Sequence, residues 1–503
     1  MRAVENVQMR LGEVDISQIQ FDLRSRDDIP RVLRGLQYIY THPILREKIF
    51  EILRQKIAPN ISQENGRPGM LLWRILVCGI LRLDLNIDYD RLLELMNQHL
   101  TLREMLGHDR WDRESKYMLK TVKRNVALLT PEILDEISQL LVREGHALIK
   151  KDGNGALRGR CDSFVVETHV HFPTDINLLF DATRKVIELT AQLCEKHKMS
   201  GWRQSAHLIR ELKRAMRYAQ SSKRSRKKSE ETQEESAEKI KHREYVQLTQ
   251  KYLSKARDSL MILTLECGLS AIESVTIVAE IKGFMKHADR QIDQIERRVL
   301  KGETIPHEEK VFSLFQPHTE WISKGKAGVP VELGIRVCVL EDHHGFILHH
   351  HVMQKQTDEV VATLMVREAQ KRFTGLSVCS FDRGFHSPQN QIELAQMLEH
   401  VGLPRKGKLS QKAREHENSA GFRAARHKHA AVESAINGLE VHGLDVCPDH
   451  GITGFKRYVA FAVLARNIHR LGDIVWKRDI QRAKRAQIRA EKKRCAQNLA
   501  RAA

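Results

Sequence analysis

Apolar side chains recur at helical spacing through the first 150 residues of the chain. Leu33, Leu36 and Ile39 lie on one face of a predicted helix, and the nearly all-apolar stretch Leu71–Leu83 predicts a helix that is buried on every side. Further helices are expected at about 88–96, 113–128 and 131–149. This region also carries a local basic patch that could contact nucleic acid, formed by Arg110, Arg113, Lys116, Lys120, Lys123 and Arg124. We therefore interpret residues 1–150 as a helical N-terminal DNA-recognition domain, although a purely structural helical cap would account for the same pattern.

The pattern becomes strand-like at 160–172, a run rich in β-branched and aromatic residues that closes at Pro173. Helical spacing then resumes from 175 to 315, and a β-hairpin is predicted at 331–352. Alternating elements follow, with helices at about 357–371, 388–400, 422–441 and 451–472, and strands at 376–382 and 401–404.

This order of elements predicts an α/β core with a mixed five-stranded sheet and a large helical insertion after its first strand. The expected core comprises 155–174 and 316–473, with the helical insertion at 175–315 between its two parts and a basic C-terminal tail at 474–503.

Charge is concentrated in two segments of the 503-residue chain, which carries 83 Lys and Arg against 64 Asp and Glu, a net charge of +19. Residues 201–229 hold ten basic residues against one acidic residue, and residues 474–503 hold ten against two. Such segments indicate contact with a polyanion, most simply the phosphate backbone of nucleic acid, although a solvated helix and tail would carry the same charge.

Other features of composition narrow the class of protein. The eight cysteines are scattered singly with no CxxC pair, which argues against a zinc finger or a disulfide framework. No run of eighteen uncharged apolar residues is present, and the first thirty residues are too charged for a secretory signal. We therefore expect a cytoplasmic protein.

Three acidic residues lie on elements of the predicted core that are expected to be close together in space. Asp162 lies on the first strand, Asp382 ends the strand after the hairpin and its crossover helix, and Glu433 lies on a late helix. The crossover makes the two strands adjacent and parallel, so their carboxylates can converge, with the helix supplying the third. Such a cluster binds two Mg²⁺ or Mn²⁺ ions for phosphoryl transfer, whereas each residue alone fits an ordinary edge, turn or helix-surface position.

The local sequences strengthen this interpretation. Asp162-Ser163-Phe164-Val165-Val166-Glu167-Thr168-His169-Val170-His171-Phe172-Pro173-Thr174-Asp175 with Leu178-Leu179 resembles the D-[ST]-x-V-V-E-T-x-I-H-Y-P-T-D-x-x-L-L signature of the ISNCY-type group of bacterial insertion-sequence DDE transposases. Three further segments resemble parts of that group. Residues 382–387 resemble its second-aspartate turn, and residues 321–326 with 331–334 resemble the entry to its β-hairpin. Residues 403–408 resemble the stretch that follows its second aspartate.

The resemblance implies an RNase H-like core in which Asp162, Asp382 and Glu433 are the catalytic, metal-binding residues, with two Mg²⁺ (or Mn²⁺) ions per active site. It also implies cleavage at the ends of an insertion sequence, joining to target DNA, recognition of terminal inverted repeats, a homodimer in the DNA complex and a nucleoid-associated place in a bacterial cell. Relatives often hold Tyr, Arg and Lys where this chain has Arg426, His429 and Glu440. Glu440 is therefore the alternative third carboxylate.

Basic residues between the second and third carboxylates are expected to bind the phosphates of the substrate. Segment 403–429 holds eight Lys and Arg against two Glu, a net +6. The residues predicted to bind DNA are Lys324, Lys326, Arg383, Arg405, Lys406, Lys408, Arg423, Arg426 and Lys428.

Several other assignments stay open at this stage. A catalytically silent DNA-binding derivative and an RNase H-like nuclease are the alternative functions. The histidines at 343, 344, 349, 350 and 351 permit a zinc site, but exposed strand and turn histidines explain them better. Glu167 is expected on the opposite sheet face from Asp162, and Asp175 fits a helix N-cap in competition with Thr174.

Overall fold

The chain forms two compact units, Met1–His169 with Ile322–Ala503, and Val170–Trp321. The computed structural model describes residues 3–5, 9, 12–57, 69–109, 111–112, 114–149, 156–221, 237–266, 272–323, 330–429 and 431–502. The predicted DNA-binding residues Lys324 and Lys326 lie outside the described residues.

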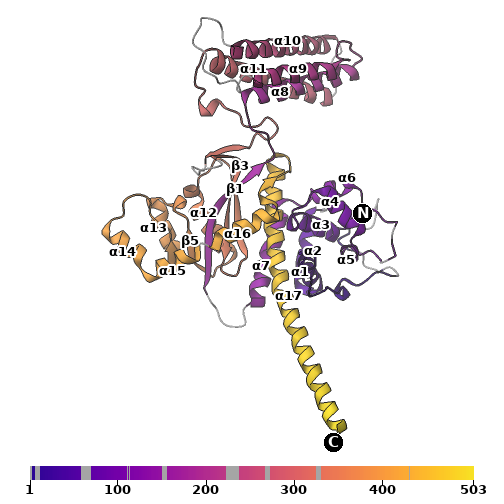
Figure 1. The fold of residues 1–503 in the computed structure, drawn as a ribbon, viewed down its shortest axis with the longest axis vertical. Helices are drawn as coiled ribbons and strands as arrows, with labels where there is room; N and C mark the ends of the chain where they lie inside the picture. The colour runs from indigo at the N-terminus through magenta and orange to yellow at the C-terminus, as the bar shows by residue number, and fades with distance from the viewer. Residues whose placement is uncertain are drawn as a thin grey trace. The chain divides into compact units, whose positions relative to one another are not determined.

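The N-terminal part of the first unit is helical, as the apolar spacing predicts (Figure 1). Its helices are α1 (Ile29–Thr41), α2 (Pro43–Ile57), α3 (Leu72–Asp84), α4 (Tyr89–Gln98), α5 (Leu100–Met105), α6 (Leu119–Val126) and α7 (Pro131–Ile149). Every residue of α3 except Arg74 is buried, because α1, α4 and α6 pack around it together with α17 (Gly451–Ala502). At the contact with α17 the two backbones approach so closely that a Cβ on Gly79 would lie 2.2 Å from Cε1 of Phe461.

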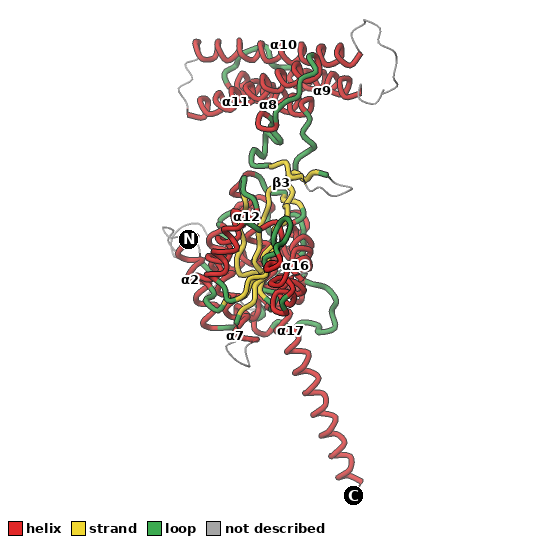
Figure 2. The backbone as a smooth tube through the Cα atoms, turned by 90° about the vertical axis from the view of Figure 1, so that its left-hand side faces the viewer, coloured by secondary structure: helices red, strands yellow, loops and turns green. Residues whose placement is uncertain are grey.

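A mixed, open sheet forms the centre of the first unit (Figure 2). Its strands are β1 (Leu157–Thr168), β2 (Glu320–Ser323), β3 (Val331–Asp342), β4 (Ile347–Met353), β5 (Leu376–Phe381), β6 (His400–Gly402) and β7 (Val446–Cys447). β1 pairs antiparallel with β3 and parallel with β5, β4 pairs antiparallel with β3, and β6 continues the parallel side.

The expectation of five strands is therefore too low, since the described residues form seven. The two additional strands are β2, with four residues, and β7, with two. Segments this short carry no readable period-2 alternation, so pattern analysis passes over them. The predicted adjacency of β1 and the Asp382 strand is confirmed.

Helices α12 (Asp358–Arg372), α13 (Pro388–Met397), α14 (Gln411–Asn418), α15 (Ala420–His429) and α16 (Ala431–Leu439) accompany the sheet. The predicted helix over 422–441 is divided between α15 and α16. α14 has no apolar stripe and a single buried residue, Ala413, which explains why its periodicity gives no signal. Its start is marked instead by Ser410, whose hydroxyl accepts a hydrogen bond from the backbone N–H of Ala413 at 3.3 Å.

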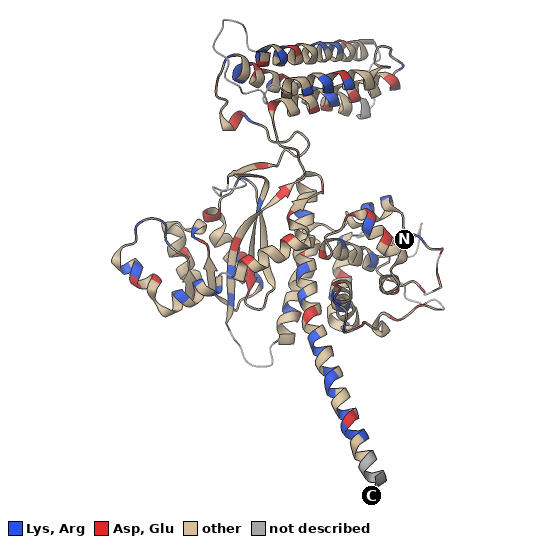
Figure 3. Cartoon of the chain, in the orientation of Figure 1, with Lys and Arg blue, Asp and Glu red and all other residues tan. Residues whose placement is uncertain are grey.

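α17 continues well beyond residue 472, where the apolar pattern predicts its end. Its first part is buried against α1, α3 and α7, whereas residues 481–497 are all exposed. Figure 3 shows that basic residues dominate this exposed part. The basic segment at 474–503 is thus helical through residue 502, and helix propensity rather than burial accounts for the extension, since the segment is rich in Ala, Arg and Lys.

The second unit is built from four long helices, α8 (Asp175–Lys196), α9 (Ser205–Ser221), α10 (Ala237–Glu266) and α11 (Ile272–Ile295). They share an apolar core of their own. Thr174, not Asp175, caps α8: its hydroxyl accepts from the backbone N–H of Asn177 at 3.2 Å, and the Asp175 carboxylate pairs with Arg298 at 2.7 Å. The basic residues at 222–229 lie outside the described residues.

Among the described residues, none of the helices has the length and apolar character needed to cross a lipid bilayer.

Candidate active site

The two aspartates of the predicted trio lie side by side in the sheet. β1 and β5 run parallel, with Cys161 paired with Phe381, so Asp162, the next residue of β1, lies beside Asp382, the residue that follows β5. Asp162 is half-buried and Asp382 is exposed. Parallel pairing therefore brings together two carboxylates that are 220 positions apart in the sequence (382 − 162).

Electrostatics joins Glu433 to this pair. Burial, together with the negative charges of Asp382, Asp358 and Glu433, raises the pKa of Asp162 to about 7. The backbone N–H of Ser163, which donates to Oδ1 of Asp162 at 2.7 Å, opposes the shift. Glu440, the alternative third carboxylate, begins the π-helical turn after α16.

Asp358 is a fourth carboxylate at this site, and sequence reasoning missed it. It is the first residue of α12, and its Oδ1 accepts a 2.6 Å hydrogen bond from the hydroxyl of Ser163. Its other oxygen, Oδ2, lies next to Gly384, since a Cβ built on that glycine would be only 2.9 Å away. Asp358 therefore also contacts the turn after Asp382. In the sequence, Asp358 indicates only an acidic first turn of a helix, which the helix dipole favours.

His429, at the end of α15, faces the same site. Its Nδ1 lies 3.1 Å from the hydroxyl of Ser380, two residues before Asp382. Burial lowers the pKa of His429, while the charges of Asp382 and Glu433 act to raise it. This imidazole therefore lies where the resembling family often has an arginine, and it is close enough to sense two of the three predicted carboxylates.

Of the predicted DNA-binding residues, Arg383 directly follows Asp382, and Lys406 contacts the same turn. The Nζ of Lys406 donates to the backbone carbonyl of Gly384 at 3.0 Å and lies 3.6 Å from the Glu359 carboxylate. The side chains of the remaining described members of the set are all exposed: Arg383, Arg405, Lys408, Arg423, Arg426 and Lys428. Exposed cations around an acidic centre can hold the phosphates on either side of a scissile bond.

A different trio has the tightest spacing of metal-ligand atoms. Among the described residues, ligand atoms of Asp84, His442 and His469 lie within 4.8 Å of one another, and all three side chains are buried. This trio could bind a metal ion, but its present hydrogen bonds also explain it. His469 Nδ1 donates to the Asp84 carboxylate at 3.0 Å, and His442 Nδ1 donates to the Asp84 backbone carbonyl at 2.6 Å. The trio thus joins α3, α17 and the turn after α16.

Of the hairpin histidines, His343 is exposed, whereas His344, His349, His350 and His351 are half-buried, so the expectation of solvent-facing histidines is wrong for these four. Burial lowers the pKa of His349 to about 2 and that of His350 to about 4, so both are neutral. His351 Nε2 bonds the side-chain oxygen of Gln356 at 2.7 Å. The zinc site considered from the sequence is not among the metal-capable groups of the described residues.

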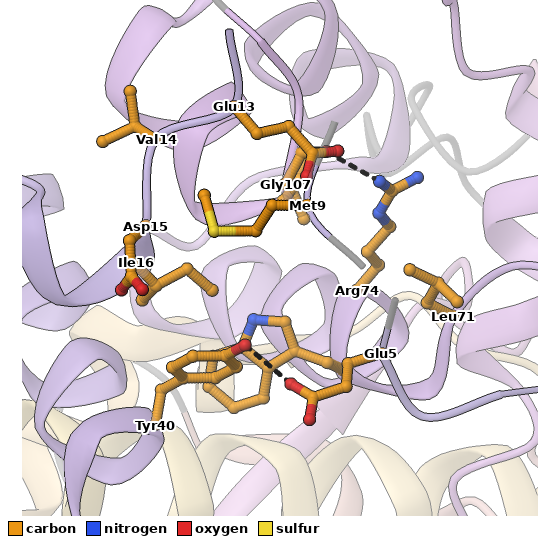
Figure 4. Close-up of a pocket in the computed structure, with 12 residues that line it drawn as sticks. Glu5, Met9, Glu13, Val14, Asp15, Ile16, Tyr40, Leu71, Arg74 and Gly107 are labelled. Atoms are coloured by element: carbon orange, nitrogen blue, oxygen red, sulfur yellow. Dashed lines mark hydrogen bonds between the residues drawn. The ribbon is translucent and has the colours of Figure 1, made fainter. Parts of the chain in front are cut away.

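A small cavity of about 80 Å³ lies among the N-terminal helices (Figure 4). Tyr40 points toward Glu5 at its base and donates a 2.6 Å hydrogen bond to the carboxylate. Ligand pockets usually measure about 300 Å³ or more, so this cavity is too small to be a substrate site.

Comparison of the chain with protein-family models, with curated proteins and with solved structures finds no match. The assignment of function consequently rests on the geometry of the site and on the local sequences that resemble the transposase signature.

Proposed function

We propose that this chain is a DDE transposase, which hydrolyses a phosphodiester at each end of a mobile DNA element and joins the freed 3′-hydroxyls to target DNA. The observation that carries the proposal is the pairing of Cys161 with Phe381 in parallel strands, which sets Asp162 beside Asp382. A third carboxylate, Glu433, acts electrostatically on the same centre.

The carboxylates of Asp162, Asp382 and Glu433 are chemically suited to divalent metal ions, and their ligand atoms are spread more widely than the 4.8 Å that encloses those of Asp84, His442 and His469. Carboxylate oxygens are the ligands that Mg²⁺ and Mn²⁺ prefer, and the repulsion that adds to burial in raising the pKa of Asp162 would be relieved by a bound cation. Asp162, Asp382 and Glu433 would hold two such ions, which when bound supply Lewis acidity to the attacking and leaving oxygens of the phosphodiester.

The protein's own side chains would position the DNA. Lys406, fixed against the turn after Asp382, is placed to bind a phosphate next to the scissile bond. The exposed cations of 403–429 extend this grip, and the exposed basic part of α17 adds backbone affinity without sequence preference. Recognition of terminal inverted repeats by the N-terminal helices, and a homodimer that holds both ends, belong to the same proposal.

The proposed reaction has two steps, hydrolysis and transesterification, and neither forms a covalent bond between DNA and the enzyme. Water attacks the phosphorus and breaks the P–O3′ bond, leaving a 3′-hydroxyl on the element and a 5′-phosphate on the flanking strand. The 3′-hydroxyl then attacks a target phosphodiester, so one phosphodiester forms as another breaks.

Purified full-length protein incubated with Mg²⁺, a supercoiled target plasmid and linear DNA carrying the sequences that flank the gene tests the proposal. We expect strand cleavage and joined products, and a loss of at least about a hundredfold for Asp382→Asn. Asp258→Asn, the same chemical change at an exposed position of α10, is the matched control and should retain activity.

Each other outcome identifies an alternative function. Cleavage that survives Asp382→Asn contradicts the assignment of the site. Cleavage of DNA or of an RNA–DNA hybrid without joined products indicates an RNase H-like nuclease. Tight DNA binding with neither reaction indicates a catalytically silent derivative.

A further inference from the structure

A cavity of about 650 Å³ lies between the parallel side of the sheet and helices α15 and α16. Strand residues Arg158, Arg160, Val378 and Ser380 line one wall. This volume lies within the range of about 300–1,000 Å³ usual for small-ligand pockets. The cavity is therefore large enough to bind a ligand.

The cavity adjoins the carboxylate centre. Arg160 and Ser380 lie two residues before Asp162 and Asp382, and side chains two apart on a strand share a sheet face. His429 lies between the cavity and the carboxylate centre. It is hydrogen-bonded to Ser380, and the charges of Asp382 and Arg160 both affect its pKa. A polymer whose scissile bond lies at the carboxylates would thus run directly into the cavity.

The lining combines small apolar residues with basic groups. Gly421, Ala424 and Ala425 of α15 provide a wall without bulky side chains. Arg158 and Lys428 are exposed at its margin, and no acidic residue is among the described residues that line it. Arg160 forms an ion pair with Glu341 at 2.5 Å, which neutralises its charge. It therefore offers a ligand the flat face of its guanidinium group and little net charge.

Imidazoles complete the lining, contributed by His343, His400 and His427. Histidine rings and guanidinium planes stack on nucleobases, while exposed cations bind phosphate. A flat heteroaromatic group joined to a phosphate matches this combination, whereas a purely apolar ligand would leave the basic margin without a partner.

We infer that this cavity binds a nucleotide of single-stranded DNA, next to the phosphodiester held at the carboxylates. The inference rests on the proposed function for its choice of DNA. Binding itself requires neither metal nor catalysis, so it is tested separately from the reaction.

The test adds a ring at the wall of the cavity. Gly421 lines the cavity, and a Cβ on it would have no heavy atom within 4 Å, so Gly421→Phe meets no clash at its first side-chain atom. Gly421→Ala is the matched control, because it makes the same change to the helix backbone without occupying the space. Gly283→Phe, on α11 of the other unit, also meets nothing within 4 Å and controls for an added exposed ring.

Binding of a fluorescein-labelled 12-nucleotide oligothymidylate is measured by anisotropy in EDTA, with a blunt duplex and an oligouridylate of equal length as competitors. We expect Gly421→Phe to weaken oligothymidylate binding about tenfold, as the loss of one stacked base would, while both controls bind as the wild type does. Lys428→Gln should lower the slope of log affinity against log salt by roughly one phosphate contact.

The inference is overturned if the wild-type protein does not bind the oligothymidylate, or if Gly421→Phe binds it unchanged. An equal loss of duplex affinity in Gly421→Phe contradicts a single-strand pocket, and tighter binding of oligouridylate contradicts the choice of DNA. Weakened binding in Gly421→Phe, together with cleavage that survives Asp382→Asn, would leave the pocket intact and remove only the proposed function.

Discussion

The hydroxyl of Ser163 donates a 2.6 Å hydrogen bond to Oδ1 of Asp358. This bond ties the strand that carries Asp162 to the first residue of α12, and the other oxygen of Asp358 lies against the turn that follows Asp382. One side chain therefore touches the surroundings of both predicted catalytic aspartates, and its charge contributes to the raised pKa of Asp162.

Asp358 should act as a positioning residue for the carboxylate centre. We expect Asp358→Asn to lower cleavage by about 10- to 100-fold and to raise the Mg²⁺ concentration needed for half-maximal activity, as loss of a partner behind a metal ligand does. Cleavage is measured against Mg²⁺ concentration. Glu368→Gln, on the same helix but paired with Lys371, is the control. An unchanged Mg²⁺ dependence in Asp358→Asn would contradict a positioning role.

The stability of the metal-free protein should fall as the pH rises from about 4 to about 7. The folded pKa of Asp162, about 7, lies above its ordinary value of 3.8, so protonation stabilises the fold and ionisation destabilises it. Glu341 contributes with the same sign, since burial raises its pKa to about 7. Urea unfolding in EDTA at pH 5 and pH 8 measures the effect.

Asp162→Asn isolates the contribution of that residue, because asparagine does not titrate. The free energy of unfolding should change between pH 5 and pH 8 by less in the variant than in the wild type, with the two changes differing by on the order of 1–3 kcal/mol. Added Mg²⁺ at pH 8 should stabilise the wild type more than the variant. Identical pH profiles for the two proteins would show that Asp162 is not perturbed.

The buried pair of Asp84 and His469 should stabilise the fold most at low pH. Burial acts to lower the pKa of His469, but its hydrogen bond to Asp84 and the charge of that carboxylate outweigh burial, so the pKa is raised. The resulting stability is present below the unfolded value of about 6.5 and is lost as the pH rises through the folded pKa. We expect His469→Gln to cost about 1–3 kcal/mol at pH 6 and less at pH 9.

Unfolding of wild type and His469→Gln at the two pH values measures this difference. A loss of stability in the wild type on adding a chelator of transition metals would instead mean that a metal ion holds Asp84, His442 and His469 together.

The contact between α3 and α17 should not tolerate added volume. Gly79→Ala forces its new methyl group against Phe461, and we expect a cost of about 1–3 kcal/mol. Phe461→Leu in the same chain should recover part of that cost, giving a coupling energy of about 0.5–3 kcal/mol in a double-mutant cycle of urea unfolding. Strictly additive effects would contradict the close approach.

The exposed part of α17 should supply affinity for duplex DNA without sequence preference. Residues 481–503 hold eight Lys and Arg and one Glu. Their deletion should weaken binding of any duplex and make the affinity less dependent on salt. A duplex of unrelated sequence, titrated at several salt concentrations, gives the comparison, and an effect confined to one sequence would point to base recognition instead.

The sequence by itself determined most of the local elements and the adjacency of two carboxylates. Runs rich in β-branched and apolar residues, bounded by turn signals, located β1, β3, β4 and β5. The crossover helix before β5 made it parallel to β1, which sufficed to predict that Asp162 and Asp382 lie side by side.

Only the tertiary structure decided the rest. The 195 positions between Ser163 and Asp358, and the 385 between Asp84 and His469, are bridged by packing that no periodicity records. The cavity beneath α15 likewise depends on the distance between a helix and a sheet. Apolar spacing reports which face of an element is buried, but not which distant element covers that face, and polar partnerships across that contact are set only when the chain has folded.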